Sequence, residues 1–468
     1  MKAKKVFSLF MAAVMTAGLA ACGGGDGGSN ASSASESKGK DSGKKQKLTF
    51  CFRDDGIGKE NALWKWIDSA YDSWAKKDEV ELDVAPITAS EGDYFTKVAL
   101  QLSDPSTCPD LVAEDTFQLP NDVSAGYLTN LDDYVKDYDD WQDGKYFESM
   151  QKAVTGEDGS VYGIPYNSDT RGIFYNREIM TTAGVIKEGQ DWEPENWDDI
   201  LDACEKVKEK CPDVVPFWCN AGVATGEATS MQTYEMLLYG TGDRLITDDG
   251  EWVVKSKGME DSLKFLQDIY VNNEYGPSLD LVLNGQASNT SAREYLPEDK
   301  LAMSMDGIWI TGNWKDDGTS PVKDYGEKFG LAAMPTSKGQ DPKTVTLAGG
   351  WALSIPENSD MKDITFEFVK HMMEPDTYLK SILQQGNICT RTDVAEMDDY
   401  TKQPFFDEAT QFLKTADFRP QNDQYSSVST NIQTMVESVV SGTSIKDAMT
   451  QYKADVTRTV GDDEVTEQ

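Results

Sequence analysis

Charged side chains follow two predicted strands early in the folded part of the sequence. The run KLTFCFRDDG (residues 47–56) is typical of a buried strand that opens into a loop at Arg53, Asp54 and Asp55. A later short run, DLVAED, ends at Asp115. Guanidinium and carboxylate groups make bidentate hydrogen bonds to polar ligands. These two loops are therefore candidate binding positions.

This chain lacks the residues that most kinds of catalytic site require. The sequence has one histidine, His371, in FVKHMME, where helical spacing favours a structural role. Zinc hydrolysis through HExxH and a nucleophilic triad on a second histidine are therefore excluded, and no GxSxG, GxxxxGKS, GxGxxG or EF-hand pattern occurs. A pair of carboxylates, as in glycoside hydrolases, remains available among the 81 acidic residues. No cofactor or metal ion is expected.

Alternating strand and helix patterns predict the elements that position the two loops. Apolar residues recur at helical spacing over residues 63–74 and 95–102, and an alternating run covers residues 80–84. With the two strands above, the order is β-α-β-α-β, which opens a parallel sheet with helices on its faces. Ligands bind at the carboxyl ends of such strands. Further helices are expected over residues 259–272, 360–373, 376–385, 428–441 and 444–459.

The first 46 residues have the layout of an exported lipoprotein. Basic residues precede an apolar run at residues 6–20, which is shorter than the roughly 20 residues that a membrane-spanning helix needs. The sequence LAAC, ending at Cys22, resembles the bacterial lipobox, in which the cysteine receives a lipid and becomes the new N-terminus. Residues 23–46 lack large apolar side chains and predict a flexible tether. A signal peptide without lipidation is the alternative.

Composition limits the class of partner. A formal net charge of −37 disfavours nucleic acid and anionic lipid as ligands and is typical of a solvated surface. The roughly 420 residues after the tether exceed one normal core, so two lobes are expected. No zinc spacing occurs among the six cysteines that follow Cys22. They are expected to be mostly buried thiols, with a disulfide among Cys204, Cys211 and Cys219 as the alternative.

Four motifs in order resemble one known family. The stretch VYGIPYNSDTRGIFYNREIMTTAGV (residues 161–185) resembles the motif of extracellular solute-binding proteins of carbohydrate ABC importers, which include the maltose-binding proteins. DKLAMSMDGIW (residues 299–309), FGLAAMPTSKG (residues 329–339) and GGWALSIPENSDMKDITFEFVKHMM (residues 349–373) resemble later segments of the same family. Together with the lipobox, these motifs cover nearly the whole mature chain.

The resemblance implies an α/β fold of the periplasmic-binding-protein type, with two lobes, a multi-crossing hinge and a ligand cleft between them. Crossings are expected near residues 162–166, near residues 329–335 and after Arg391. The corresponding division is a signal peptide at 1–21, the lipidated cysteine and tether at 22–46, lobe 1 at 47–164 plus 335–395, and lobe 2 at 165–334 plus 396–468.

The resemblance also implies ligand-binding residues beyond Arg53, Asp54, Asp55 and Asp115. Trp309 corresponds to the stacking position of the second lobe, with a core tryptophan as the alternative. Trp351 lies in a Gly-Gly-Trp loop where the backbone can approach a ligand, with a core position as the alternative. Asp169 and Arg171 follow the first crossing, where an ion pair that only stiffens the hinge is the alternative. Tyr94 begins the second helix and either points into the cleft or packs that helix.

The sequence thus predicts a non-enzymatic sugar-binding subunit of an ABC importer. It is expected to be a monomer, anchored by lipid at the outer face of the cytoplasmic membrane, and to deliver a mono- or oligosaccharide to membrane permease subunits. The FRDDG and SDTRG stretches depart from the maltose-binding pattern, so the sugar itself is not identified. A secreted two-carboxylate glycoside hydrolase and a binder of a cationic solute are the alternatives.

Overall fold

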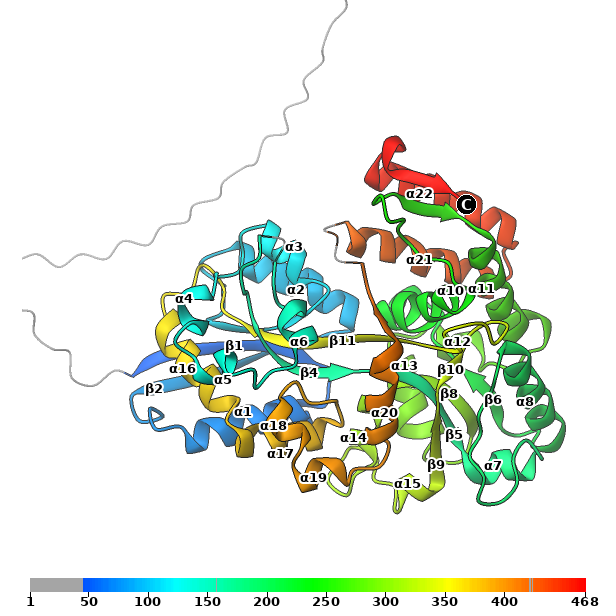
Figure 1. Ribbon diagram of the computed structural model, residues 1–468, viewed down its shortest axis with the longest axis horizontal. Helices are drawn as coiled ribbons and strands as arrows, with labels where there is room; N and C mark the ends of the chain where they lie inside the picture. Colours follow the sequence, from blue (N-terminus) through cyan, green and yellow to red (C-terminus); the bar gives the residue numbers. More distant parts are fainter. Residues whose placement is uncertain (1–44, 157, 421, 423) are drawn as a thin grey trace, which may run out of the picture. The chain divides into compact units, whose positions relative to one another are not determined.

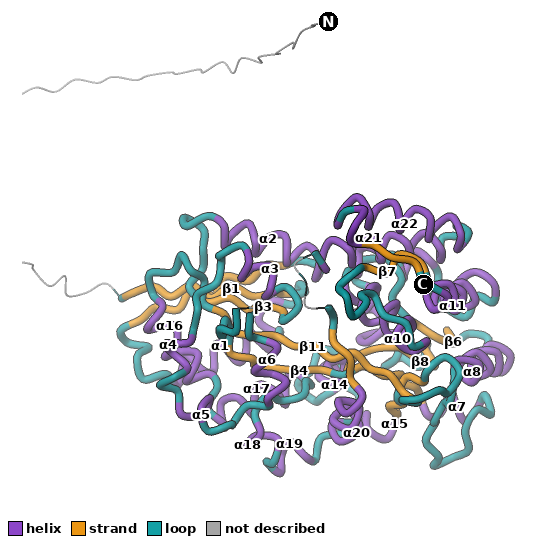
Figure 2. Tube along the Cα trace, turned by 45° about the horizontal axis from the view of Figure 1, so that its top comes forward, coloured by secondary structure: helices purple, strands orange, loops and turns teal. Residues whose placement is uncertain are grey.

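The computed structural model describes residues 45–156, 158–420, 422 and 424–468. The signal sequence, Cys22 and all but the last two residues of the predicted tether lie outside the described residues. Residues 45–468 form one compact unit, which contains two main sheets with helices around each (Figures 1 and 2). We call the first sheet with its helices lobe 1 and the second sheet with its helices lobe 2.

The main sheet of lobe 1 has the predicted parallel beginning. Strand β1 (Gln46–Asp54) pairs in parallel with β2 (Val80–Thr88) and β3 (Leu111–Asp115), with α1 (Ala62–Ser73) and α2 (Glu91–Ser103) between them. The sheet order is β10-β11-β3-β1-β2, in which β10 is Met334–Pro335 and β11 is Thr344–Ser354. Strands β4 (Ile164–Asp169) and β12 (Ala416–Phe418) also pair with β11. The β-α-β-α-β prediction is confirmed.

Apolar side chains explain why these segments fold as they do. In β1, Leu48, Phe50 and Phe52 are fully buried, as expected for a strand covered on both faces. In α1, residues three and four apart, among them Trp66 and Ala70, face the core. Asn61 begins α1 by accepting a hydrogen bond from the backbone N–H of Leu63. The other helices of lobe 1 are α3 (Leu119–Ser124), α4 (Asp132–Val135), α5 (Asp139–Gln142), α6 (Glu148–Ala153), α16 (Lys362–Met372), α17 (Pro375–Gln385), α18 (Thr392–Ala395) and α19 (Asp398–Thr401).

Lobe 2 contains a four-stranded sheet in the order β6-β8-β5-β9. Its strands are β6 (Val215–Trp218), β8 (Leu301–Gly307), β5 (Arg171–Asn176) and β9 (Phe329–Ala332). The surrounding helices are α7 (Arg177–Thr182), α8 (Trp197–Lys210), α9 (Glu227–Thr229), α10 (Met236–Thr241), α11 (Lys257–Gln267), α12 (Leu279–Val282), α13 (Ala287–Thr290), α14 (Thr311–Trp314), α15 (Tyr325–Lys328), α21 (Tyr425–Val440) and α22 (Ile445–Val460). Three π-helical segments, η3 (Ser230–Glu235), η4 (Asp268–Asn272) and η5 (Ser291–Tyr295), extend some of them. Strand β7 (Trp252–Lys255) pairs with the C-terminal β13 (Val465–Glu467).

The chain crosses between the sheets later than the sequence predicted. Strand β4 belongs to the lobe 1 sheet and β5 to the lobe 2 sheet, so the first crossing is at Thr170 rather than at residues 162–166. The second crossing lies inside β11. Its Val345 and Leu347 share the core of lobe 2, whereas Leu353 packs in lobe 1. The first residues of β11 therefore pack against the core of lobe 2, although the strand belongs to the main sheet of lobe 1.

The third crossing follows Arg391, as expected. Helices α18 and α19 remain with α17 in lobe 1, so residues 396–401 do not begin lobe 2. The chain then passes through α20 (Phe406–Phe412), and β12 runs parallel to residues 346–348 of β11 before α21 begins. Three extended segments, β4–β5, β11 and β12, therefore join the lobes.

Several local predictions hold in the structure. Helix α17 ends at Gly386, whose φ of 77° is the left-handed conformation that glycine adopts readily. His371 lies in α16 with its Nε2 atom 3.1 Å from the carbonyl oxygen of Ala70, a structural position. The six described cysteines are all free thiols, so the disulfide alternative is not found among them. Among the described helices, none is long and apolar enough to cross a membrane.

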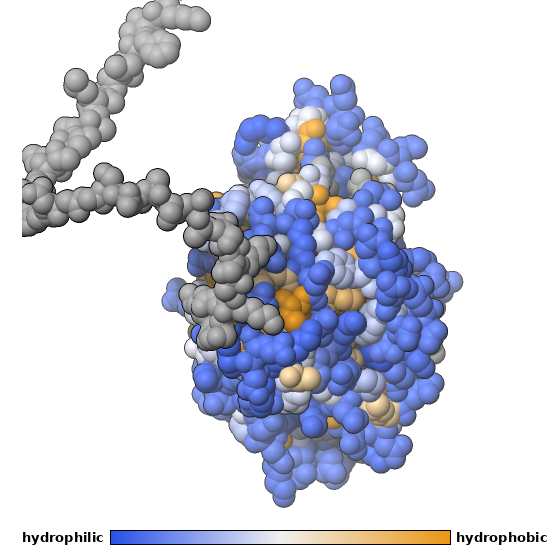
Figure 3. Space-filling model, turned by 90° about the vertical axis from the view of Figure 1, so that its left-hand side faces the viewer, coloured by the Kyte–Doolittle hydropathy of each residue, from blue (hydrophilic) through white to orange (hydrophobic). Residues whose placement is uncertain are grey.

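The surface agrees with the acidic composition. Where grey atoms do not cover it, the face of the molecule in Figure 3 is mostly hydrophilic, with small separate apolar areas. Large apolar side chains that are exposed, such as Leu100 and Phe418, are scattered along the sequence. Scattered apolar residues of this kind are normal on a folded protein.

A buried carboxyl pair in lobe 1 leads to a prediction about pH. Glu114 of β3 and Asp122 of α3 are both fully buried. Burial, followed by the nearby charges of Asp122 and Asp115, raises the pKa of Glu114 well above its usual range. Burial also raises the pKa of Asp122 to about 6. The folded protein therefore holds protons here that the unfolded chain has released.

The two carboxyl groups stabilise the folded protein in their protonated form. This contribution is fully present below about pH 4 and is lost as the pH rises through their pKa values in the folded protein. We expect the free energy of unfolding to fall over that range, by on the order of 3 kcal/mol from Asp122 alone, with a further loss from Glu114. Glu114→Gln should flatten the decline, because a neutral amide replaces one acid. Melting curves recorded between pH 5 and 9 measure how steeply stability declines with pH. An unchanged slope in Glu114→Gln, equal to that of the exposed control Glu79→Gln, would contradict the assignment.

Candidate functional site

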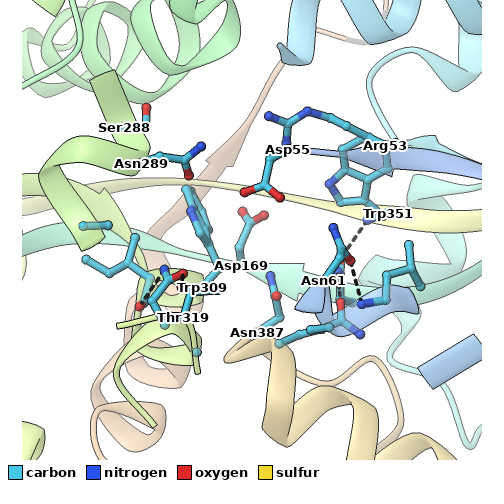
Figure 4. Close-up of a pocket in the computed structure, with 18 of the residues that line it drawn as sticks. Arg53, Asp55, Asn61, Asp169, Ser288, Asn289, Trp309, Thr319, Trp351 and Asn387 are labelled. Atoms are coloured by element: carbon cyan, nitrogen blue, oxygen red, sulfur yellow. Dashed lines mark hydrogen bonds between the residues drawn. The ribbon is translucent and has the colours of Figure 1, made fainter. Parts of the chain in front are cut away.

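A cavity of about 340 Å³ lies between the lobes, within the range of small-molecule sites. Both lobes and the crossing strands contribute to it (Figure 4). Its polar lining includes Arg53, Asp55, Asn61, Asp115, Asn167, Asp169, Arg171, Glu227, Gln232, Ser288, Asn289, Arg293, Asp306, Asn313, Gln385, Asn387 and Arg419. Trp309 and Trp351 are its tryptophans.

The carboxyl end of β1 supplies two of the predicted residues. Arg53 and Asp55 line the cavity. The atoms Nε of Arg53 and Oδ1 of Asp55 are buried and have no hydrogen-bond partner among the described residues. Buried polar groups are normally satisfied, so one donor and one acceptor are available here for a ligand.

Asp54 lies outside the cavity lining because neighbouring side chains of a strand point to opposite faces. Its carboxylate accepts hydrogen bonds from the backbone N–H of Gly58 at 3.1 Å and from the hydroxyl of Thr88 at 3.3 Å. Asp54 therefore shapes the loop after β1. Its expected contact with ligand is not supported by this position.

Tyr94 is also outside the cavity lining. The side chain is fully buried, and its hydroxyl donates a hydrogen bond to the carbonyl oxygen of Ala113 at 2.7 Å. Its ring centroid is 5.9 Å from that of Trp351. Of the two alternatives for this residue, the structure favours packing of α2 against the sheet.

Asp169 and Arg171 flank the first crossing and form a buried ion pair that lines the cavity. The guanidinium of Arg171 also donates to the carbonyl oxygen of Leu347 at 3.0 Å. The carboxylate of Asp169 accepts from the backbone N–H of Gly349 at 3.0 Å. The pair therefore ties two crossing strands together at the cavity wall, so stiffening the hinge and facing the ligand are compatible roles.

Trp309 lies at the end of β8, in the short helix η6 (Ile308–Ile310), and is partly exposed. Its ring lies directly against the backbone of Gly307, where an added Cβ would be 1.7 Å from the ring. The guanidinium carbon of Arg171 is 4.8 Å from the ring centroid. Glycine and arginine thus hold the indole at the cavity wall.

Trp351 belongs to β11 and lies on the opposite side of the cavity from Trp309 in Figure 4. Its ring stacks on Phe95 with centroids 6.2 Å apart and an interplanar angle of 24°. Its backbone N–H donates to the side chain of Asn167 at 2.9 Å. Aromatic rings on both sides give the cavity two apolar faces inside a polar rim.

Three charged residues of the cavity, Arg293, Glu227 and Arg419, were not predicted from the sequence. Arg293 of η5 pairs with Asp55 of the other lobe. Arg419, just after β12, pairs with Asp115 at 2.8 Å and with Glu227 at 3.3 Å. These partners are more than 190 residues apart in sequence and belong to no local motif, so only the fold reveals them.

Behind Glu227 lies a buried carboxyl–tyrosine network. The hydroxyl of Tyr425 is 3.0 Å from Glu227 Oε2 and also bonds to Glu235. Burial, followed by the charge of Glu227, raises the pKa of Glu235 to about 8. Glu235 is therefore protonated at neutral pH, and the hydroxyl of Tyr425 donates toward the two buried carboxyl groups of Glu227 and Glu235.

Most charges of the cavity are neutralised by one another. Arg171, Arg293, Arg419 and Lys65 each have a carboxylate partner. Asp306 lacks an ion pair in the described structure. Its carboxylate accepts from the backbone N–H of Gly307 at 2.9 Å and from Gln232 at 3.4 Å, and burial raises its pKa to about 7. Such a surface suits a polar ligand with many hydroxyl groups better than a highly charged one.

No group of three or more potential metal ligands occurs among the described residues. The arrangement offers hydrogen bonds, stacking faces and enclosure between lobes.

Comparison with known proteins then decides the family. Residues 58–378 match the family described as bacterial extracellular solute-binding protein.

The chain belongs to that family. The resemblance seen in the sequence is thereby confirmed. Among curated relatives of this solute-binding protein, the maltodextrin-binding protein MdxE of Bacillus subtilis is 24% identical over 366 residues, which is 75% of this chain and 72% of the relative. The arabinooligosaccharide-binding protein of Halalkalibacterium halodurans is 23% identical over 273 residues, which is 58% of this chain and 56% of the relative.

Solved structures confirm the fold class of this solute-binding protein. An ABC transporter solute-binding protein from Thermotoga lettingae bound with alpha-D-tagatose has a TM-score of 0.75 and 23% identity. The match covers 89% of this chain and 100% of the Thermotoga chain. Maltose-bound MalE3 of T. maritima has a TM-score of 0.75 and 20% identity, and the match covers 88% of this chain and 99% of MalE3. The two-lobe α/β fold is therefore that of the periplasmic binding proteins.

Proposed function

We propose that this solute-binding protein captures a saccharide in the cavity between its lobes and delivers it to the permease of an ABC importer. The observation that carries the proposal is the pair of tryptophans, Trp309 and Trp351, on opposite lobes of a polar cavity. A pyranose has an apolar face and a ring of hydroxyl groups, which match stacking faces and a hydrogen-bonding rim. The names of its curated relatives support the same class of ligand.

The second part of the proposal is that the protein binds its ligand without catalysing a reaction. Four carboxylates of the cavity, Asp55, Asp115, Asp169 and Glu227, are held in ion pairs with arginine, whereas Asp306 is not. A glycosidase needs one carboxyl group that can give up and regain a proton and a second that is free to attack or to activate water. Ion-paired carboxylates are poor candidates for either role, and the family is one of binding proteins.

Lobe closure follows from the connection of the two lobes by three extended segments. Hinge motion about such segments encloses a ligand in many two-lobed proteins. In this proposal the closed form, with both lobes against the sugar, is what the permease recognises. The protein acts as a monomer at the outer face of the cytoplasmic membrane.

A thermal-shift screen with neutral mono- and oligosaccharides tests the proposal. A ligand at 100 times its dissociation constant should stabilise the protein by about 2.7 kcal/mol. A reproducible rise in melting temperature with at least one sugar is expected. Polyamines that stabilise the protein while all sugars fail would contradict the proposal.

Anchoring by lipid on Cys22 is part of the same proposal and rests on the sequence alone. Cys22→Ser should leave folding and sugar binding intact but move the full-length protein from the membrane fraction to the medium. Cys108→Ser, which changes a partly buried thiol of the folded unit, is the matched control and should stay membrane-bound. Cell fractionation that finds Cys22→Ser still firmly bound to the membrane speaks against lipidation.

A further inference from the structure

One wall of the cavity is a segment of lobe 2 that reaches lobe 1. This wall segment, residues 315–320, follows α14 and has the sequence KDDGTS. Its Asp317, Gly318 and Thr319 line the cavity, as do Lys65 of α1 and Gln384 of α17 from the other lobe. The wall segment therefore meets lobe 1 beside the space that a ligand would occupy.

Polar contacts join the wall segment to α17. The side-chain amide of Gln384 donates to the carboxylate of Asp317 at 3.1 Å. The ammonium of Lys315 donates to the carbonyl oxygen of Leu383 and, at 3.0 Å, to the side chain of Gln403. A cation at the last carbonyl groups of a helix is favourable, so Lys315 caps α17 from the other lobe.

The backbones of the two lobes also touch beside this wall. A Cβ added at Gly386 would be 2.6 Å from the backbone nitrogen of Gly312, and one added at Gly312 would be 2.6 Å from the carbonyl oxygen of Gln385. Only glycine fits at such separations. The contact between α14 and the end of α17 leaves no passage for a ligand at that point.

Internal hydrogen bonds hold the wall segment in its folded shape. The backbone N–H of Ser320 donates to the carbonyl oxygen of Asn313 at 2.8 Å, and the hydroxyl of Thr319 donates to the side chain of Asn313 at 2.7 Å. The same side-chain oxygen accepts from Arg293 at 2.9 Å. Arg293 pairs with Asp55 of lobe 1, so the wall continues into a second bridge across the cleft.

We infer that the wall segment restricts the ligand of this protein to one or two sugar units. The inference rests on the proposed saccharide-binding function. A longer chain extending past α17 would have to break the contacts of Lys315 and Asp317 and separate Gly312 from Gly386. The cavity volume of about 340 Å³ agrees, because it lies near the lower end of the range for small-molecule sites.

Matched sugar series test this inference directly. Titration calorimetry is carried out with the mono-, di- and tetrasaccharides of glucose, arabinose and mannose. In any series that binds, the wild-type protein should bind the tetrasaccharide at least tenfold more weakly than the best shorter sugar. A tetrasaccharide bound as tightly as the shorter sugars overturns the inference but leaves the proposed function intact. Failure of every sugar of every length contradicts both.

A variant in which two glycines replace residues 316–319 identifies the wall as the cause. In wild type, the dissociation constant of the tetrasaccharide should exceed that of the best shorter sugar. The variant should lower this ratio of dissociation constants at least tenfold. Lys323→Ala, at an exposed position just beyond the wall segment, is the control and should keep the wild-type ratio. An unchanged ratio in a glycine variant with a normal melting curve overturns the assignment. If that variant does not fold, Asp317→Ala replaces it and should shift the ratio in the same direction.

Discussion

Trp309→Ala should weaken sugar binding at least tenfold while leaving the melting temperature of the empty protein nearly unchanged. The ring lies at the cavity wall between Gly307 and Arg171 and is partly exposed. Truncation of a buried aromatic side chain costs roughly 3 to 5 kcal/mol in a core. A stacking contact with a hydrated sugar is weaker, yet 1.4 kcal/mol already corresponds to tenfold in affinity.

Gly307→Ala provides an independent test of the same contact. The new Cβ would be 1.7 Å from the indole, so the ring must move away from its present position. Binding should fall although Trp309 itself is still present. Trp314→Ala is the contrasting control, because Trp314 is fully buried and its loss should destabilise the empty protein. A Trp309→Ala protein that melts as early as Trp314→Ala would show that Trp309 is core packing, and Trp351 would become the main stacking face.

Arg419→Met should cause the largest loss of stability. The substitution removes the guanidinium that pairs with the buried carboxylates of Asp115 and Glu227. Breaking a buried ion pair from one side costs about 3 to 5 kcal/mol, because a charge remains buried without compensation. Denaturant unfolding of the empty protein measures the loss.

The control for Arg419 is Arg244→Met, which breaks the more exposed pair with Asp417 at 3.1 Å. Surface pairs contribute about 0 to 1 kcal/mol, so this variant should be close to wild type. The triple variant Arg419→Met, Asp115→Asn, Glu227→Gln should recover part of the lost stability, because it removes the uncompensated charges. Equal effects of Arg419→Met and Arg244→Met would contradict the buried network.

The parallel beginning of the fold was predictable because its signals are local. Apolar spacing identifies α1, and an uninterrupted apolar run identifies β1. The placement of Arg53 and Asp55 at the cavity follows from the general rule for the carboxyl ends of parallel strands. Asp54 lies outside the cavity lining because a strand alternates its faces, whereas the sequence reasoning treated three successive residues alike.

The crossings could not be located in the same way. Strand β11 is continuous from residues in the core of lobe 2 to residues in the core of lobe 1. Nothing in its sequence marks the point at which it changes lobe. The third crossing is the three-residue strand β12, which is too short to give a pattern.

The remaining site residues depend on contacts that are distant in sequence. Arg293 meets Asp55 across 238 positions, and Arg419 meets Asp115 across 304. A single sequence with 81 acidic residues offers many equivalent partners for each arginine. Charge complementarity alone therefore could not select the pairs that line the cavity.

We expect the cavity between the lobes to bind a sugar without altering it. Titration calorimetry with the sugar that gives the largest thermal shift, followed by chromatography of the recovered ligand, measures both binding and any change in the sugar. Binding of one sugar per protein should be saturable, and the ligand should be recovered unchanged. Binding that Trp309→Ala does not weaken, or recovery of shorter sugars with new reducing ends, would contradict this function.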